Sequence, residues 1–567
     1  MAGRPGAPPL AAALLLLPLL CATSLLPAAG AARHDAAPPR YKILTLIPMG
    51  GSSHTFDLVA VAGVLATRHD VTVVTPPSDH GHTAAAIKRL GDAAGAMKLE
   101  DVDALLSMAS FSKGIGSIGK GGLVSMVRKM SQLPYWMAER CEQMLGNATL
   151  MESWRSYDVI LTFLFPPPGQ DTCTCLLGQA LGIPVVHVLD MVLMEAPINV
   201  PQFGSGLSRA EVRGTWAGAL KNAGFYALQN TLMKALAWAE VGANRKLRAR
   251  LGLPLGRGGC RPVVGLLSSS WLLEEPQALE PHQIMVGPVS ARPSSPVIPD
   301  PAIAAFAAEA AAEDGLVLIS FGSVSSFFGS LLTKEDYVNL ALAFADLAPV
   351  RVLWLLNPRG LPEGVTVEGL PLGNNTLMVP WGPINDVLGH PSCRAFVTHG
   401  GLKSTLEAMF HGVPIVGVPF MSEQLHNTQR AAARGFGVVS PQAPVVRKDG
   451  THYTREGVAS LIRKVLSPSY ATAANQIGAA MRLAYSQKRP VDRAAEEVEL
   501  ALLHGGYSVE HSLAQARLRE GKARRQGSSG GGGGLEAALG AEVSRGDVAA
   551  AVMAPAQSAA ADAAQEL

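Results

Sequence analysis

Short β-rich runs alternate with helical patterns along most of the chain, and this alternation limits the fold more than any other feature. The first run, Tyr41–Ile47, is followed by a glycine-rich turn and then by a helical pattern through Leu58, Val61 and Leu65. Val71–Thr75 forms the next expected strand. A strand, a glycine-rich turn, a helix and a second strand make the opening unit of a doubly wound parallel sheet.

The alternation occurs twice, which predicts two Rossmann-like domains. Further strands of the first domain are expected at Val159–Leu164, Val185–Val188 and Val263–Leu267. The second series is expected at Val317–Ser320, Val352–Leu355, Leu377–Val379, Ala395–Thr398, Ile415–Val418 and Gly437–Val439, with helices such as Ser404–Phe410 and Leu425–Ala433 between them. The fold class is therefore α/β, with two doubly wound domains facing a cleft that binds a ligand.

Five parts follow from these patterns. We expect a signal peptide over 1–32, an N-terminal Rossmann-like domain over 33–268, a linker rich in proline and glutamate over 269–300, a C-terminal Rossmann-like domain over 301–505, and a flexible low-complexity tail over 506–567.

The first residues have the pattern of a secretory signal peptide. The apolar block Leu10–Leu20 is followed by the small residues Ala28–Ala31, so the mature chain is expected to begin near Ala32. A retained signal anchor is the alternative. Pro18 and Pro27 interrupt the apolar stretch, however, and leave less than a full bilayer span.

Beyond this leader the sequence shows no apolar run long enough for a transmembrane helix, so no C-terminal anchor is evident. The last residues, Ala564–Leu567, match an ER-retention signal only in part. We expect a protein of the secretory pathway, either in the lumen of the endoplasmic reticulum or secreted. There the triplets Asn147–Thr149 and Asn374–Thr376 are glycosylation sequons.

Charge and cysteine content exclude several classes of function. The chain has 47 Lys and Arg against 45 Asp and Glu, and this balance argues against nucleic acid as a partner. Cys21 lies in the leader and five cysteines remain, so we expect no disulfide framework. Cys173 and Cys175 are interpreted as small buried residues, because no ligand spacing accompanies them. We expect no metal and no cofactor.

The segment Phe396–Gln424 carries the strongest chemical signal. An expected strand ends at Thr398, two glycines follow, and Ser404 is expected to open a helix whose free N–H groups attract phosphate. His399 stands at the carboxyl end of the strand, where open α/β sheets bind ligands. Glu407 lies one helical turn beyond Ser404, where a carboxylate can accept both hydroxyls of a ribose.

This segment, which closes on Glu423 and Gln424, resembles the signature of the UDP-glycosyltransferase family nearly position by position. The resemblance covers most of residues 40–500, and it includes Val317–Ser323, Trp381–Ile384, Asp386–Pro391 and Asn427. It implies the GT-B fold of glycosyltransferases, in which the first domain binds an acceptor and the second a UDP-sugar.

The resemblance assigns the donor site to a defined set of residues. Trp381 would stack on the uracil, Ser323, His399, Gly401 and Ser404 would hold the diphosphate, Glu407 would hold the ribose, and Glu423 and Gln424, with Asn427 nearby, would contact the sugar. The alternatives are structural roles: a core aromatic for Trp381, a plain N-cap for Ser404 and a solvated charge for Glu407. Two departures are Ile384, where the family usually has Gln, and Glu423, where Asp is commoner.

His54, after the first strand, matches the catalytic histidine of the family and would act as general base on an acceptor hydroxyl. Many members place an aspartate partner for this histidine after the strand that begins at Val159. Phe163 stands at about that position here. Asp171 is the candidate that remains, either as the catalytic partner or as the N-cap of an expected helix over Thr172–Leu181.

These assignments imply inverting, metal-independent transfer of a hexose from a UDP-sugar to a hydroxyl of a small lipophilic acceptor. UDP-glucose is the favoured donor and UDP-glucuronate the second. Phe111–Met137 either lines the acceptor pocket or forms a helix in the domain core. The alternative function is a catalytically weakened binding protein for a UDP-sugar or a lipophile. The sequence leaves open whether the chain forms a homo-oligomer.

Overall fold

The computed structural model describes residues 40–48, 54–103, 105, 132, 135, 138–163, 170–189, 198–202, 205–250, 264–312, 314–322, 332–358, 361–420, 422–443 and 452–504. The predicted signal peptide and tail, the first glycine-rich turn, Ser323 and nearly all of Phe111–Met137 lie outside these residues.

The first sheet contains seven parallel strands in the order β3-β2-β1-β4-β5-β6-β7. Their bounds are Lys42–Leu46 for β1, Asp70–Thr75 for β2, Met97–Asp101 for β3, Val159–Phe163 for β4, Val185–Leu189 for β5, Val264–Leu267 for β6 and Gln283–Met285 for β7. β1, β2, β4, β5 and β6 fall where the sequence predicts them.

The second sheet contains six parallel strands in the equivalent order, β10-β9-β8-β11-β12-β13. Their bounds are Leu316–Ser320 for β8, Arg351–Leu355 for β9, Thr376–Val379 for β10, Cys393–Thr398 for β11, Ile415–Gly417 for β12 and Gly437–Val439 for β13. Every strand predicted for this part is present. Both sheets belong to one compact unit of the chain, which begins at Tyr41.

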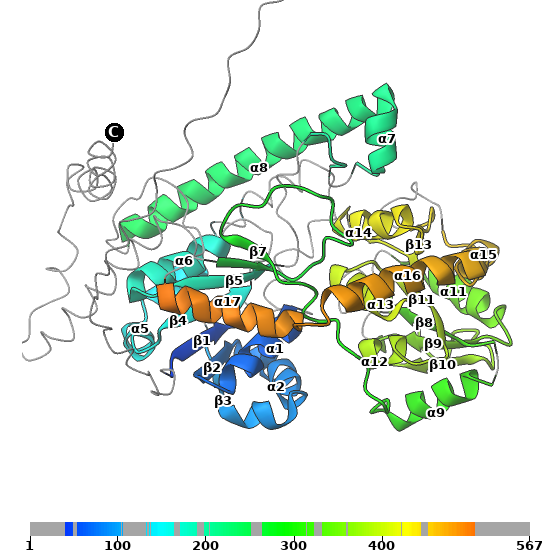
Figure 1. Ribbon diagram of the computed structural model, residues 1–567, viewed down its shortest axis with the longest axis horizontal. Coiled ribbons are helices and arrows are strands. Elements are labelled where there is room, and N and C mark those ends of the chain that lie inside the picture. The colour runs from blue at the N-terminus through cyan, green and yellow to red at the C-terminus, as the bar shows by residue number, and fades with distance from the viewer. Residues whose placement is uncertain are drawn as a thin grey trace, which may run out of the picture. The chain divides into compact units, whose positions relative to one another are not determined.

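Helices connect the strands of both sheets (Figure 1). Between β1 and β6 in the sequence come α1 (His54–Ala66), α2 (His80–Lys88), α5 (Ala148–Trp154), α6 (Gln170–Leu181), α7 (Arg209–Gly214), α8 (Trp216–Arg250) and the 3₁₀ turns η1 (Pro77–Asp79) and η2 (Gly91–Ala96). After β7 come α9 (Pro301–Ala310), α11 (Lys334–Ala345), α12 (Ile384–Leu388), α13 (Leu402–His411), α14 (Ser422–Ala433), α15 (Arg455–Val465), α16 (Pro468–Ala484) and α17 (Pro490–His504).

Burial explains why these runs form strands. β4, β5, β6 and β8 are buried along their whole length, as expected for parallel strands with helices on both faces. Two edge strands differ: β10 is half-buried throughout, and β3 has only exposed or half-buried residues. Its sequence, Met-Lys-Leu-Glu-Asp, carries no buried β pattern, which is why the sequence does not predict it.

Two elements cross the predicted domain boundaries. β7 lies within the predicted linker 269–300 and pairs with β6 at the edge of the first sheet. α17, which falls in the predicted C-terminal domain, packs on the first sheet: Ala494, Ala495 and Val498 share a core cluster with α1. Figure 1 shows α17, in orange, beside α1. The first core is therefore completed by residues 490–504, and a linear domain boundary does not describe it.

A disulfide joins Cys141 to Cys173, which lie 32 residues apart. Cys173 is buried, as expected, but the expectation of no disulfide framework did not foresee this bond. Counting cysteines could not find the bond, because an odd number allows one pair as readily as none. The bond ties the segment before α5 to α6, inside a core cluster that includes Leu176 and Trp154. Cys393 is a free cysteine, and burial raises the pKa of its thiol to about 12.

Within the part of the chain that the structure describes, no helix combines the length and the apolar character needed to cross a membrane. Asn147 and Asn374, the two sequon asparagines, are exposed.

Replacing both Cys141 and Cys173 by Ala is expected to destabilise the fold. A closed loop of this length is worth about 3–4 kcal/mol in the chain-entropy description, and the melting temperature should fall by several degrees. Cys393→Ala is the matched control, since it removes a thiol that forms no disulfide. Scanning calorimetry measures both variants, and equal melting temperatures for the double variant and the wild type would contradict the assignment.

Candidate functional site

Each sheet reverses its strand order beside its own first strand. β1 lies between β2 and β4, and β8 lies between β9 and β11. Open α/β sheets bind ligands at such a point, outside the carboxyl ends of the strands. The segments that follow β1, β4, β8 and β11 therefore make up the candidate site.

His54 is the first residue of α1 and comes from the first of these segments. The sequence places it at the end of a loop, whereas the structure places it within the helix. Its imidazole stacks on the ring of Phe163, the last residue of β4, with centroids 4.9 Å apart and planes inclined by 16°. The strands bring the two together, since Leu46 and Thr162 are paired neighbours.

Asp171 does not precede α6 as the sequence predicts. It is the second residue of that helix, which begins at Gln170, and its side chain lies outside what the structure describes. Phe163 stands at about the position where the resemblance would put an aspartate partner for His54, and its contact with His54 is aromatic stacking.

His399 follows β11 and is held between two glycines. A Cβ built on Gly322 would lie 2.5 Å from His399 Cε1, and one built on Gly401 would lie 2.5 Å from Nε2. Neither position has room for a side chain, and Gly322 also has a φ of 69°. Burial lowers the pKa of His399 to about 4, against the opposing effect of the Ser320 backbone. At pH 7 the imidazole is neutral and has one N–H to donate.

α13 begins two residues earlier than the sequence predicts. Its N-cap is Gly401, which has no side chain to bond the first turn, and Ser404 is the third helical residue. The first-turn N–H groups and the helix dipole therefore favour an anion in front of this helix. Gly400, with a φ of 84°, turns the chain out of β11, and a Cβ there would lie 2.3 Å from Thr428.

Three charged residues meet where α1 approaches α13. Asp57 lies in the first turn of α1, three residues after His54, and is almost fully buried. Its Oδ2 lies 3.1 Å from Lys403 Nζ and accepts a 2.8 Å hydrogen bond from Ser268 Oγ. Glu407 lies one turn beyond Lys403. Burial raises the pKa of Glu407 to about 8; Asp57 adds to this rise, while Lys403 and Arg292 oppose it.

Trp381 is 55% exposed, so the alternative of a core aromatic does not hold. The Arg89 guanidinium lies 4.3 Å from the centre of the indole and 5.0 Å from the ring of Phe56. Arg89 follows α2, and Phe56 lies two residues after His54. This cation–π contact places Trp381 close to the segment that carries His54. Ile384 begins α12 and packs on an apolar cluster.

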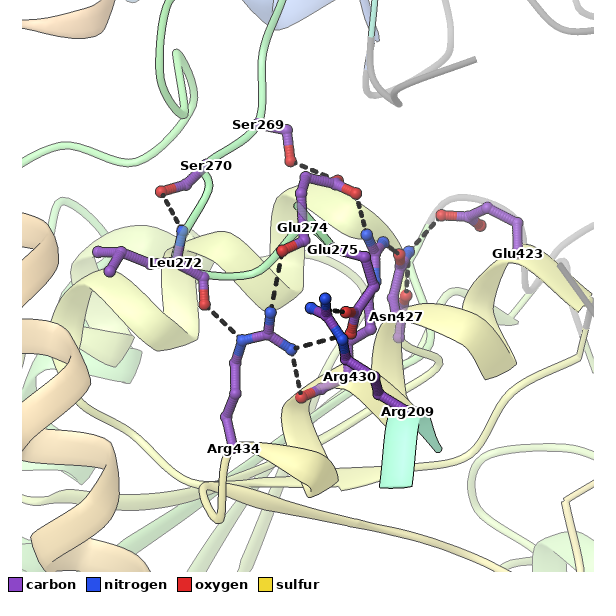
Figure 2. Close-up of polar contacts among 11 residues, drawn as sticks. Arg209, Ser269, Ser270, Leu272, Glu274, Glu275, Glu423, Asn427, Arg430 and Arg434 are labelled. Carbon is purple, nitrogen blue, oxygen red and sulfur yellow. Dashed lines mark hydrogen bonds and ion pairs between the residues drawn. The ribbon is translucent and has the colours of Figure 1, made fainter. Parts of the chain in front are cut away.

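Asn427 of α14 connects the parts of the second sheet's edge. Its Nδ2 donates a 3.0 Å hydrogen bond to Gly400 O and another to Glu423 Oε1, and its Oδ1 accepts from Arg430 (Figure 2). The amide has both of its hydrogens and its oxygen engaged by protein groups. Asn427 therefore has a positioning role, and its contact with a donor stays a prediction. Gln424 is also buried and accepts from Phe420 N at 2.9 Å.

The contacts continue from α14 to the segment that follows β6. Arg430 forms an ion pair with Glu274, whose Oε1 accepts a 2.7 Å hydrogen bond from Ser269. Arg434 donates to the backbone oxygens of Leu272 and Glu274, at 2.5 and 3.0 Å (Figure 2). These buried charges are paired, which is what makes their burial tolerable. They fix α14, and with it Glu423, against the chain that leaves the first sheet.

The structure brings together most of the residues that the sequence predicts, namely His399, Gly401, Ser404, Glu407, Glu423 and Gln424, along the edge formed by β11, β12 and the helices after them. Ser323 follows β8 but lies outside the described residues. Sequence reasoning missed Asp57, Lys403 and Arg89. Only Asp57 gave a signal, because its spacing puts it on the same helical face as His54. Among the described residues, no group of three or more His, Cys, Asp and Glu has the arrangement of a metal site.

The family model described as "UDP-glucoronosyl and UDP-glucosyl transferase" matches residues 260–513, which include the whole second sheet and α17. UDP-glucuronosyltransferase 2A2 of Mus musculus is 28% identical over 382 residues, which are 65% of this chain and 66% of the relative. 2-Hydroxyacylsphingosine 1-beta-galactosyltransferase of Rattus norvegicus is 27% identical over 381 residues, 65% of this chain and 64% of the relative. Each match spans just under two thirds of the relative's length.

Over residues 260–513 the chain matches the UDP-glycosyltransferase family, and the relatives it resembles belong to that family too. Solved structures of glycosyltransferases have a similar fold. The glycotransferase of kitacinnamycin has a TM-score of 0.52 at 19% identity, and a UDP-glucosyltransferase from Polygonum tinctorium has 0.52 at 18%. Each match covers 82% of this chain and 99% of the other. The chain thus has the GT-B arrangement of two Rossmann-like domains.

Glu407 is expected to make this protein less stable as the pH rises. Its folded pKa of about 8 lies above the ordinary value of 4.5, so between these values the unfolded chain releases a proton that the folded chain keeps. The stabilising contribution is complete below pH 4.5 and is lost as the pH rises through 8. Glu407→Gln removes this loss and should raise the melting temperature at pH 8.5 by about 2–4 °C relative to the wild type.

Thermal scans from pH 5 to pH 9 measure this difference. Glu363→Gln, at an exposed glutamate in a loop, is the control and should follow the wild type at every pH. A constant offset between Glu407→Gln and the wild type across the range would show that Glu407 ionises normally in the folded protein.

Proposed function

We propose that this UDP-glycosyltransferase transfers a hexose from a UDP-sugar to a hydroxyl of a small lipophilic acceptor, with His54 as the general base. One observation carries the proposal: the buried contact between Asp57 and Lys403. Asp57 lies three residues after His54, and Lys403 lies directly before Ser404 in the first turn of α13. This ion pair therefore holds the helix that carries the candidate base close to the helix that carries the candidate diphosphate site.

The donor would bind along the edge of the second sheet. The first turn of α13 and the neutral His399 supply N–H donors for the diphosphate, and Glu407 faces the ribose hydroxyls. Trp381 offers an exposed indole face to the uracil. Because Asn427 holds Glu423 in place, Glu423 is the group best placed to accept from the hydroxyls of the sugar, with Gln424 beside it.

The chemistry is a single displacement at the anomeric carbon. A neutral His54 takes the proton of the acceptor hydroxyl while its oxygen attacks the carbon, and the bond to the β-phosphate oxygen breaks on the opposite face. The anomeric centre is inverted. The negative charge that develops on UDP is stabilised by the donors in front of α13, so no metal ion is required for the step.

Phe163, in place of a carboxylate beside His54, affects which acceptor hydroxyls can react. Stacking holds the His54 ring, but a phenyl group gives the imidazolium no charge stabilisation as it forms. Asp171 stays a candidate for that role. Without a carboxylate, transfer is favoured to a hydroxyl that gives up its proton readily, such as a phenol. A lipophilic acceptor is also consistent with the relative named for 2-hydroxyacylsphingosine.

UDP-glucose remains the favoured donor and UDP-glucuronate the second, both named in the description of the family model. The predicted leader implies that the enzyme works in the secretory pathway. We place it in the lumen of the endoplasmic reticulum or outside the cell, and we propose that it requires no cofactor other than the UDP-sugar.

The activity is tested by incubating the purified protein with radiolabelled UDP-glucose or UDP-glucuronate and a panel of phenols, with and without EDTA. We expect transfer that EDTA does not reduce. His54→Ala should lower kcat/KM by about 100-fold or more, the usual contribution of a general base. His82→Ala, at an exposed histidine of α2, is the control. Undiminished transfer by His54→Ala would remove the base assignment, and UDP binding without any transfer would favour the binding-protein alternative.

Trp381→Ala is expected to weaken UDP binding about 5- to 100-fold, because stacking of a base on an aromatic ring contributes roughly 1–3 kcal/mol. Trp381→Phe should retain most of the affinity. Isothermal titration calorimetry with UDP measures both. Trp271→Ala is the matched control, since Trp271 is also partly exposed, at 42%. An unchanged dissociation constant for Trp381→Ala would place the uracil elsewhere.

A further inference from the structure

A series of polar contacts runs from the segment after β6 to Glu423. Ser269 Oγ donates a 2.7 Å hydrogen bond to Glu274 Oε1, and Glu274 Oε2 accepts from Arg430 Nη1. Arg430 Nη2 donates to Asn427 Oδ1, and Asn427 Nδ2 donates to Glu423 Oε1. Figure 2 shows these contacts one after another. We call Glu274, Arg430 and Asn427, which are all buried, the relay.

The hydrogen bonds of the relay can run in only one direction. A guanidinium group donates and cannot accept, so the amide of Asn427 turns its oxygen toward Arg430. Its NH₂ group then faces the oxygen of Gly400, at 3.0 Å, and Glu423 Oε1. If the amide were reversed, its oxygen would face two other acceptors, the carbonyl and the carboxylate. Arg430 therefore determines which way Asn427 donates.

Glu274 holds the guanidinium of Arg430 in place. The two residues are 4% and 6% exposed, so neither charge has much contact with water. Without Glu274, Arg430 would lose its ion-pair partner in a buried site, which is strongly unfavourable. Arg430 belongs to α14, whereas Glu274 belongs to the segment that leaves the first sheet after β6. The direction of the Asn427 amide thus depends on a residue outside α14.

Packing of α14 does not by itself explain this arrangement. A buried ion pair often adds little to stability, and apolar residues of similar volume can frequently replace it without loss. Arg434, four residues after Arg430, already ties the end of α14 to the same segment through two backbone oxygens. What the pair of Glu274 and Arg430 adds is the orientation of Asn427 and, through it, of the Glu423 carboxylate.

We propose that Glu274 and Arg430 are positioning residues for recognition of the donor sugar, because they orient the carboxylate of Glu423 toward the sugar hydroxyls. The inference rests on the proposed function, in which Glu423 contacts the sugar. A carboxylate has about four acceptor sites, so a bond from Asn427 leaves it able to accept from a hydroxyl. Hydrogen bonds to a charged group depend on direction and weaken when the acceptor turns away. The relay is therefore expected to act on the sugar part of the donor and not on UDP.

A comparison of donor binding with UDP binding tests the proposal, because UDP lacks the sugar. The donor used is whichever of UDP-glucose and UDP-glucuronate the wild type binds more tightly. Isothermal titration calorimetry on the full chain gives the dissociation constants of the donor and of UDP, and their ratio measures sugar recognition. The variant combines Glu274→Met with Arg430→Met, which removes both charges and keeps most of the side-chain volume.

We expect this variant to raise the ratio of the donor's dissociation constant to that of UDP about 10-fold or more, as the loss of one hydrogen bond to a charged group does. The dissociation constant of UDP should stay close to the wild-type value. Arg430→Lys is a second, milder variant that keeps a positive charge beside Glu274 but loses the planar fork that contacts two groups. It should change the ratio in the same direction.

A double-mutant cycle separates positioning from a general loosening of the fold. Glu423→Ala should raise the ratio by itself, because it removes the group that contacts the sugar. Adding Glu274→Met and Arg430→Met to Glu423→Ala should raise the ratio no further, since residues that act through one group have effects that are not additive. A merely structural role would give effects that add.

Arg209→Met combined with Glu275→Met is the matched control. Arg209 Nη1 and Glu275 Oε2 form an ion pair at 3.1 Å, and Glu275 directly follows Glu274 in the same segment (Figure 2). This pair is not part of the relay, so its removal should leave the ratio at the wild-type value. Circular dichroism melts show whether each variant is folded.

The outcomes distinguish this proposal from the proposed function. An unchanged ratio in the folded relay variants, or effects that add to that of Glu423→Ala, would overturn the positioning role alone. An unchanged ratio for Glu423→Ala would remove the sugar contact and the positioning role together. If the wild type bound neither UDP nor either donor, the proposed function itself would fall, and the positioning role with it.

Discussion

The structure depends on the reversal of strand order beside the first strand of each parallel sheet. Because the helices after β1 and β4 cover opposite faces, the segments that leave these strands separate and open a site at the carboxyl edge. The same happens after β8 and β11. His54 and Phe163 occupy the first of these points, and Gly322 and His399 occupy the second. The candidate chemistry of the molecule lies at these two points.

The ion pair between Asp57 and Lys403 connects the two points, and burying these charges costs free energy. Asp57, Lys403 and Glu407 are brought together where water is largely excluded, and the site holds two carboxylates for one ammonium group. Burial raises the pKa of Glu407 to about 8, and the charge of Asp57 adds to this rise. In the proposed site the hydroxyls of a ribose would donate hydrogen bonds to this carboxyl. The carboxyl with the perturbed pKa thus lies where the proposed donor binds.

Periodicity predicts the buried strands well because they are continuous apolar runs. It fails for β3, an exposed edge strand, and for β7, a short edge strand that is only partly buried. It also cannot show that α17, distant in the sequence, completes the first core, since that depends on packing between faces. Motif resemblance finds residues at strand ends, such as His399, because their spacing follows from the fold.

Side-chain partners are what the sequence could not supply. Asn427 lies within the motif, yet its contacts are with Gly400, Glu423 and Arg430, and only the geometry reveals a positioning role. Asp57 and Lys403 are far apart in the sequence, and neither segment contains a pattern that predicts the other as its partner. For the same reason the Cys141–Cys173 bond had to be seen in the structure.

A crystal structure of the full chain with UDP tests the central claim, that the carboxyl edge of the second sheet is a nucleotide-sugar site. We predict the uracil on the indole of Trp381, the diphosphate in front of the first turn of α13 beside His399, and the ribose hydroxyls on Glu407. UDP bound away from this edge, or bound here with its diphosphate turned away from α13, would contradict it.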